Sequence, residues 1–216
     1  MVFPNYIHIG MRTEVVFHME KVTEKRILSI RQMTMIGMLS AVSIFLGLTG
    51  LGFIPIPPVK ATIMHIPVII GAIVEGPVVG SLVGLVFGLF SMYQNFTAPG
   101  PTSFIFWNPI IALVPRVLIG ITAYYIYAFL KNKIKNKSIS IGTAAICATL
   151  VNTIGVLSLT YIFYLERYSN ALGIDSSTTG AAIAAVGVTN GIPEAIISGV
   201  ISVPVVLAIL KIKNHK

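Results

Sequence analysis

The sequence predicts an all-α integral membrane protein with six transmembrane helices, both termini in the cytoplasm, and an outer-face ligand pocket covered by loops that act as lids. Its 216 residues are 55% hydrophobic and only 10% charged, which is more apolar than the core of a soluble domain requires. A membrane-crossing helix needs about 20 apolar residues, and the apolar segments leave little sequence outside the bilayer. Lysine and arginine gather at three places, which fixes the orientation.

Six apolar segments follow one another between polar connections. They cover Ile30–Leu51, Thr62–Val74, Val78–Tyr93, Pro109–Leu130, Ile139–Leu165 and Thr189–Leu210. The second and third are short, so we expect them to be tilted or to end below the membrane surface. Together they predict one membrane domain over residues 27–213, preceded by a cytoplasmic segment over residues 1–26. Within that segment we expect translation to begin at Met19, because the residues before it fit no fold pattern.

The basic residues decide which side of the membrane each connection occupies. Cytoplasmic segments are enriched in lysine and arginine, and only an even number of spans puts all three basic clusters on one side. The clusters are Arg12, Lys21, Lys25, Arg26 and Arg31; Lys131, Lys133, Lys135 and Lys137; and Lys211, Lys213 and Lys216. This asymmetry explains the net charge of +8 without a nucleic-acid partner.

Three connections fall on the outer side, over residues 52–61, 95–108 and 166–188. They are rich in Pro, Gly, Ser and Thr and long enough to fold over the outer face, as lids of a pocket would. Surface loops without a function have the same composition. In the last one, AAIAAVG at 181–187 predicts a short helix lying over the bundle.

The segment from Thr62 to Tyr93 predicts a tight pair of neighbouring helices broken at Glu75, Gly76 and Pro77. Glycine then recurs at every fourth position, at Gly76, Gly80, Gly84 and Gly88. Such a face lets another helix approach closely in lipid. We therefore expect this pair to be a scaffold, with Glu75 solvated at the cytoplasmic break.

Two charges lie inside the apolar segments, where charges are costly and usually mark a site. Arg116 lies about two turns into the fourth span, and its planar guanidinium can hold a carboxylate with two hydrogen bonds. Glu194 lies at a similar depth in the sixth span. The two side chains either form a buried ion pair that fixes the helices or bind opposite poles of a ligand.

Further polar residues are candidates for the same pocket. Asn190 shares a helix face with Glu194, and Pro193 between them frees a backbone carbonyl. Asn152 lies in the middle of the fifth span, where it could also be a contact between helices. His65 begins the second span, and Trp107 and Asn108 lead into the fourth, where an interfacial position equally explains the tryptophan.

Motifs for catalysis are missing from the sequence. It has no H-E-x-x-H, G-x-S-x-G or Walker A motif, and its acidic residues do not cluster as a metal site requires. We expect neither enzymatic activity nor a metal or other cofactor. An enzyme using His65 or Glu194 as a base, a secondary transporter using Arg116 and Glu194 as an ion relay, and a purely structural subunit remain the alternatives.

Several stretches together resemble the substrate-binding S components of energy-coupling factor (ECF) vitamin transporters. They are the small residues of GMLSA at 37–41, the HIPVIIGAI segment from His65 with the Gly-Pro pair after it, PTSFIF at 101–106 and LVPRVLIG at 113–120. The resemblance covers nearly the whole chain from Gln32 onward. Within the family the combination is most similar to pantothenate-type members.

This resemblance implies a bacterial cell-membrane protein that binds a vitamin but does not pump it alone. Such proteins dock onto a transmembrane coupling (T) protein driven by two ATPase subunits. The family's docking contact falls on the first span, where its alanine pattern is replaced here by Gly37 and Ala41.

Pantothenate has one carboxylate together with hydroxyl and amide groups, which Arg116, Asn152 and Asn190 could bind. Glu194 suits an anion less well, unless it orients Arg116 or accepts from ligand hydroxyls. Pyridoxine, hydroxymethylpyrimidine, folate and cobalamin are the alternative ligands within the family.

Overall fold

The computed structural model describes residues 28–56 and 59–214. Residues 1–33 and 34–216 form two units, and every contact discussed below lies within the second. The cytoplasmic segment 1–26 and the start at Met19 lie outside the described residues and stay predictions.

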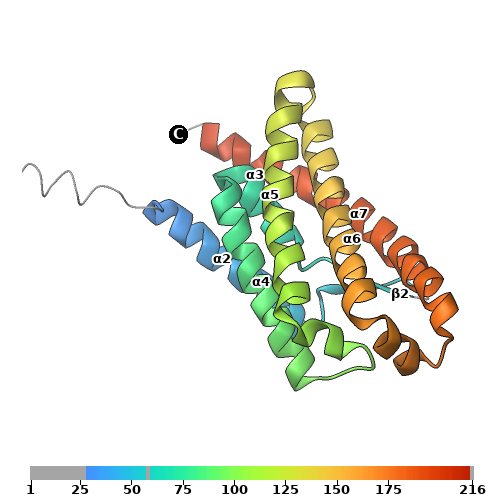
Figure 1. Cartoon of the computed structure of the whole chain (residues 1–216). Coiled ribbons are helices and arrows are strands. Elements are labelled where there is room, and N and C mark those ends of the chain that lie inside the picture. Colours follow the sequence, from blue (N-terminus) through green and yellow to red (C-terminus); the bar gives the residue numbers. More distant parts are fainter. Residues whose placement is uncertain (1–27, 57–58, 215–216) are drawn as a thin grey trace, which may run out of the picture. The chain divides into compact units, whose positions relative to one another are not determined.

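The described chain is helical apart from one short hairpin and the connections between elements (Figure 1). Its elements are α2 (Ile30–Thr49), β1 (Phe53–Ile56), β2 (Val59–Thr62), α3 (Ile66–Glu75), α4 (Pro77–Thr97), the 3-10 helix η1 (Ser103–Trp107), α5 (Pro109–Lys133), α6 (Lys137–Leu172) and α7 (Ser176–Asn214). The strands β1 and β2 are antiparallel, with Phe53 paired to Thr62 and Ile56 to Val59. The described part of the first predicted outer loop thus contains two paired strands, which the all-α prediction did not include.

Five helices of the described chain, α2, α4, α5, α6 and α7, are long and apolar enough to cross a membrane. The helix α3 has only 10 residues, about 15 Å at the rise of an α-helix, half of a bilayer core. The prediction of a second span from Thr62 is therefore wrong in extent, because residues up to Thr62 belong to a strand. Conversely, α4 is 21 residues long and extends beyond both ends of the predicted third segment, Val78–Tyr93.

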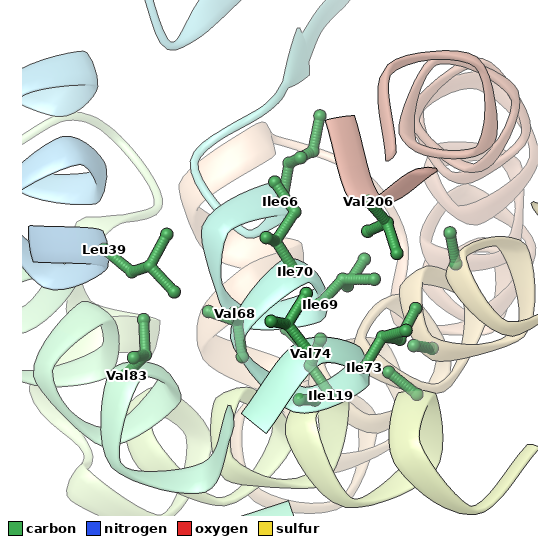
Figure 2. Packing of buried hydrophobic residues seen from close by; sticks show 14 of the residues in the cluster. Leu39, Ile66, Val68, Ile69, Ile70, Ile73, Val74, Val83, Ile119 and Val206 are labelled. Atoms are coloured by element: carbon green, nitrogen blue, oxygen red, sulfur yellow. The ribbon is translucent and has the colours of Figure 1, made fainter. Parts of the chain in front are cut away.

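The short helix α3 forms the centre of the main hydrophobic core. Every residue from Ile66 to Val74 is buried, although a helix on a bundle surface would expose one face. Figure 2 shows its side chains meeting Leu39 from α2, Val83 from α4, Ile119 from α5 and Val206 from α7. This half-length helix therefore fills the interior between the longer ones.

The glycine face of α4 packs against α5 as predicted. A Cβ atom on Gly84 would overlap the carbonyl oxygen of Arg116, and one on Gly88 would lie 2.6 Å from the carbonyl oxygen of Ala112. Gly80 faces Gly120 on α5, so both helices contribute bare backbone at that point. The break before α4 also needs glycine, because Gly76 has a backbone φ of 108°, an angle that residues other than glycine rarely adopt.

One end of the bundle carries most of the lysines of the described chain, and we call it the lysine end. The α5–α6 connection and the C-terminal end of α7 lie there, at the top of Figure 1. The Nζ atom of Lys213 donates to the carbonyl oxygen of Val74 at 3.0 Å and lies 3.5 Å from Oε1 of Glu75. The side chain of Glu75 is only 7% exposed in this ion pair, so it is largely shielded from solvent instead of solvated as expected.

The opposite end, which we call the hairpin end, carries β1, β2, η1 and the turn between α6 and α7. Most of the predicted third loop is helical, because α6 continues through Leu172 and α7 begins at Ser176. The AAIAAVG stretch is an integral part of α7 instead of a separate helix. A non-helical backbone at Tyr164 marks a kink that redirects the end of α6.

Candidate functional site

A cavity of about 290 Å³ opens toward the hairpin end of the bundle. Its lining combines two charged side chains with amides, hydroxyls and apolar groups from five elements and the segment before η1. The lining residues are Thr62, Thr102, Ile105, Phe106, Arg116, Asn152, Thr153, Val156, Leu157, Thr160, Tyr168, Val186, Asn190 and Glu194. An apolar pocket with a few convergent polar groups is the usual form of a small-molecule site.

Arg116 is held in the cavity wall by a hydrogen bond to Ile111 that the preceding residue, Pro115, makes possible. Pro115 lies inside α5 and has no N–H, so the carbonyl of Ile111, four residues earlier, loses its helical donor. The Nη1 atom of Arg116 donates to this oxygen at 2.9 Å. The Pro-Arg pair of LVPRVLIG thus creates both an unpaired acceptor and the side chain that satisfies it.

Aromatic rings occupy two further sides of the Arg116 guanidinium. Its carbon Cζ lies 4.9 Å from the ring centre of Phe106 and 5.8 Å from that of Phe87, distances at which a cation is attracted to the ring. The side chain is only 6% exposed, and Nε is buried with no hydrogen-bond partner in the part of the chain that is described. Arg116 is therefore a buried cation with donors left over.

Glu194 binds the start of the α3 segment. Its Oε1 atom accepts a hydrogen bond from the backbone N–H of Thr62 at 2.8 Å, where β2 ends and the chain enters the bundle. Non-helical backbone at this depth needs such a partner, because lipid offers none. Glu194 is 8% exposed, so this contact replaces much of its lost hydration.

Arg116 and Glu194 do not pair with each other. Across residues 28–56 and 59–214, no salt bridge or hydrogen bond joins Arg116 to a carboxylate, although its charge acts on Glu194 across the cavity. Of the two arrangements left open by the sequence, the structure has opposite charges separated by a cavity instead of a closed ion pair.

Asn152 and Asn190 also line the cavity. The Oδ1 atom of Asn152 is buried without a hydrogen-bond partner among the described residues. An orphaned amide oxygen of this kind costs free energy until a donor reaches it. Four residues chosen from the sequence, on three different helices, therefore meet at one cavity, and one of them has an acceptor to offer.

The other three predicted ligand contacts lie outside the lining. Trp107 donates from Nε1 to the carbonyl oxygen of Asn95 at 3.1 Å and stacks on Phe96. Asn108 caps α5 by accepting from the N–H of Ile110. His65 is 1% exposed, and its Nε2 lies 3.0 Å from Oγ1 of Thr149 on α6. Each has a protein partner, and their direct contact with a ligand stays a prediction.

Several lining residues on α6 were not singled out from the sequence. Thr153, Val156 and Thr160 follow Asn152 at helical spacing and face the cavity with it. The sequence pattern that could have identified them is the row of hydroxyl side chains that follows Asn152 along one face of the helix. It was missed because Ser and Thr in membrane helices usually hydrogen-bond to their own backbone, as Thr160 does to Val156.

Gly37 and Ala41, the predicted docking residues, lie on an exposed face of α2. No atom comes within 4 Å of the place that a Cβ on Gly37 would occupy. Exposed apolar side chains flank them, including Met38, Val42 and Phe45. This face of α2 has the small residues and the open space that a partner helix would need.

Known proteins are similar to this chain in sequence and in fold. The family described as "ECF transporter, substrate-specific component" matches residues 31–206. The chain is 35% identical over 172 residues to the pantothenic acid transporter PanT of Lactococcus lactis subsp. cremoris, covering 73% of this chain and 82% of that protein. It is 32% identical over 160 residues to the pantothenate transporter PanT of Leuconostoc mesenteroides, covering 71% and 78%.

A solved structure of the S component of a bacterial ECF transporter has a similar fold. It superposes on this chain with a TM-score of 0.52 at 25% sequence identity. The match covers 86% of this chain and 96% of the solved one.

Proposed function

Because the chain belongs to the substrate-specific (S) components of ECF transporters, a family of multi-pass bacterial membrane proteins, we propose that it is the subunit that binds pantothenate. Both curated relatives described above are named for pantothenate transport. The family is a binding component of transporters and not a class of enzyme. Its members work with a T protein and ATPases, and we propose one T protein and two ATPase subunits here.

One observation supports this ligand above the others: Arg116 is a buried cation that lines a cavity without a carboxylate partner among the described residues. Burying an unpaired charge is unfavourable, so a ligand carboxylate would relieve an existing cost. A guanidinium can bind a carboxylate with two parallel hydrogen bonds. Arg116 therefore provides the anchor for the anionic end of pantothenate.

The remaining groups of pantothenate find counterparts around the same cavity. Its hydroxyls and amide N–H can donate to Oδ1 of Asn152 and to the Glu194 oxygen that does not bind Thr62. This use of Glu194 removes the difficulty of a carboxylate beside an anionic ligand, because it faces hydroxyl groups instead. Apolar contacts for the methyl groups come from Phe106, Val156, Leu157 and others of the lining.

Size and charge disfavour the alternative vitamins. A volume of about 290 Å³ is at the small end for ligand pockets, and folate and cobalamin are far larger than pantothenate. Pyridoxine and hydroxymethylpyrimidine would fit, but they carry no carboxylate and would leave Arg116 buried without an anion. Pantothenate satisfies both constraints.

The charge distribution supports a cytoplasmic lysine end, which carries Lys131, Lys133, Lys211 and Lys213. The cavity then opens outward, and both termini are cytoplasmic. The hairpin β1–β2 and the η1 segment are the proposed lids, because each reaches the cavity, through Thr62 and through Phe106 respectively. The half-length α3 takes the place of one full span in this topology.

The exposed Gly37 and Ala41 face of α2 is the proposed contact for the T protein. Substituting both residues by leucine should prevent assembly with the T protein and ATPases in co-purification, while pantothenate binding stays intact. Ala208→Leu, at an exposed alanine of α7, is the matched control and should assemble normally. Assembly of the double variant at the level of the control would contradict this assignment.

Calorimetric titration of the purified protein tests the ligand. Saturable binding of pantothenate is expected, with loss of affinity in Arg116→Gln. Arg167→Gln removes an exposed arginine near the same end, stacked on Phe104 outside the lining, and should bind like the wild type. Absence of saturable heat, or tight binding of another vitamin with none of pantothenate, would overturn the proposal.

A further inference from the structure

We propose that Asn95, near the end of α4, is a positioning residue that gives the site its preference for an anionic ligand. It acts through η1, whose Phe106 ring lies against the Arg116 guanidinium. Asn95 itself is not among the residues that line the cavity. The inference rests on the proposed function, since it requires that Arg116 hold a carboxylate.

Asn95 binds both ends of η1. Its Oδ1 atom accepts from Oγ of Ser103, the first residue of η1, at 2.8 Å. Its backbone carbonyl oxygen accepts from Nε1 of Trp107, the last residue of η1, at 3.1 Å. The Nδ2 atom of Asn95 donates to the carbonyl oxygen of Ser91 at 2.8 Å, which holds the side-chain amide on its own helix. One residue of α4 thus determines where η1 begins and ends.

Further contacts fix the position of η1 between α4 and α6. Oγ of Ser103 also accepts from the N–H of Gly100 at 2.8 Å. The ring of Phe104 lies 5.6 Å from that of Tyr164 and 4.5 Å from Cζ of Arg167, both on α6. Short 3-10 helices have weak hydrogen bonds of their own, so these side-chain contacts decide where η1 lies.

Phe106 carries the position of η1 into the cavity. The Cζ atom of Arg116 lies over the ring of Phe106, 4.9 Å from its centre, and farther from the ring of Phe87, at 5.8 Å. An aromatic face attracts a guanidinium by its quadrupole, but it provides no carboxylate oxygen that would neutralise the cation. Phe106 therefore holds Arg116 in place while leaving its charge for a ligand.

A guanidinium held in place favours a carboxylate over a neutral group at the same point. Binding to a side chain that is already ordered costs less conformational entropy than binding to a mobile one. Hydrogen bonds between two ionised groups are stronger than those from an ionised group to a neutral hydroxyl, so they lose more when the guanidinium moves. Loosening η1 should therefore weaken an anionic ligand more than its neutral analogue.

The test compares pantothenate with pantothenol, its alcohol analogue, in which a hydroxymethyl group replaces the carboxylate. Calorimetric titration of the full-length protein gives the ratio of the two Kd values in each variant. Asn95→Ala removes the bond to Ser103 but keeps the backbone carbonyl that Trp107 uses, whereas Phe106→Leu removes the ring and Phe106→Tyr keeps it. Thr97→Ala is the matched control, because Oγ1 of Thr97, at the same end of α4, donates to carbonyl oxygens of its own helix.

We expect the preference for pantothenate over the alcohol to fall about tenfold in Phe106→Leu and about fivefold in Asn95→Ala, as loss of a desolvated cation–π contact would cause. Phe106→Tyr and Thr97→Ala should keep the wild-type preference within about twofold. The two ligands share all their other groups, so lost apolar contacts affect both alike. Equal weakening of both ligands in Asn95→Ala would show a merely structural role and overturn the inference, and so would an unchanged preference.

Two further outcomes keep this test separate from that of the function. Wild-type protein that fails to bind pantothenate would overturn the proposed function and this inference together. Wild-type protein that binds pantothenate, with the same preference in Asn95→Ala as in Thr97→Ala, would overturn the inference alone. If Asn95→Ala does not fold, Ser103→Ala removes the same hydrogen bond from its other side, and an unchanged preference in that variant would count against Asn95.

Discussion

Two regions of the bundle differ in how closely their helices pack. The interface between α4 and α5 is closely packed, whereas α6 and α7 form the wall of a cavity. At the first, glycines on α4 approach α5 so closely that a Cβ on Gly84 would overlap backbone. At the cavity wall, the polar side chains of Asn152 and Glu194 line an open volume instead of packing against another helix. Arg116 belongs to both, since its backbone packs on Gly84 and its side chain lines the cavity.

Because of this difference in packing, we expect substitutions in the two regions to affect different properties, namely the stability of the fold and the affinity for the ligand. Close packing in lipid stabilises the bundle through van der Waals contact, so changes at the glycine face should affect folding first. Buried polar groups without partners cost stability, so changes to cavity-wall groups that lack a partner in the described chain should affect binding first and leave folding intact or improved. Glu194 differs, because it also accepts a hydrogen bond from the N–H of Thr62.

The largest effect is expected from Arg116→Gln on pantothenate affinity. Losing the partner of a buried charge costs about 2–5 kcal/mol, or roughly thirty- to several-thousand-fold in Kd. The melting temperature of the unliganded protein in detergent should change little, because removal of a buried charge without a counter-ion offsets the loss of the hydrogen bond to Ile111. Calorimetry and a thermal-shift assay measure the two quantities. A variant that melts earlier and binds normally would break the contrast between the regions.

The next effect is expected at the glycine face, with the opposite pattern. Gly84→Ala places a methyl group against the backbone of Arg116, and overpacking of this kind costs about 1–3 kcal/mol. Gly142→Ala is the matched control, because its Cβ would make ordinary contact with Val203 at 3.4 Å. It should be neutral or stabilising, since alanine favours helix over glycine by up to about 1 kcal/mol.

Thermal unfolding in the same detergent compares these two glycine variants. Gly84→Ala should lower the melting temperature, and Gly142→Ala should leave it unchanged or raise it. Equal melting temperatures would contradict the close approach of α4 and α5.

A smaller effect should separate the two roles of Glu194. Glu194→Gln keeps an oxygen that can accept from the N–H of Thr62, so the entry to α3 should hold. Glu194→Ala removes this acceptor and leaves a part-buried N–H unpaired, at a cost of about 1–3 kcal/mol. We expect the melting temperature to fall clearly in the alanine variant and little in the glutamine variant. Similar melting temperatures for both would show that the bond to Thr62 contributes nothing.

The smallest effect is expected at the lysine end, far from the cavity. Lys213→Met removes the ion pair to Glu75 and the bond to the carbonyl of Val74, and partly exposed pairs contribute about 0–1 kcal/mol. Binding should be unchanged, and the melting temperature should shift by no more than a few degrees. A loss of pantothenate affinity measured by calorimetry would show coupling between the two ends that this division excludes.

The membrane-spanning helices could be predicted because their signals are local. Apolar length located α2, α5 and the core parts of α6 and α7, and the period of the glycines located the face that meets α5. Intramembrane charge singled out Arg116 and Glu194 before their positions were known.

The remaining features depend on tertiary contacts that sequence patterns do not carry. Thr62 belongs to a strand because it pairs with Phe53, and its N–H donates to Glu194, which lies 132 positions further along the chain. The apolar segment from Thr62 is short for a span, but apolar length alone does not show that α3 begins only at Ile66 or that its residues from Ile66 to Val74 are all buried. The bond of Arg116 to Ile111, in contrast, follows from Pro115 and could have been derived.

An experimental structure of the protein with bound pantothenate would test most directly whether Arg116 is an unpaired cation that anchors an anionic ligand. We predict that the ligand carboxylate lies within hydrogen-bond distance of the Arg116 guanidinium, with the hydroxyl end directed toward Asn152 and Glu194. A carboxylate bound elsewhere, with Arg116 and Glu194 closed into an ion pair, would contradict it.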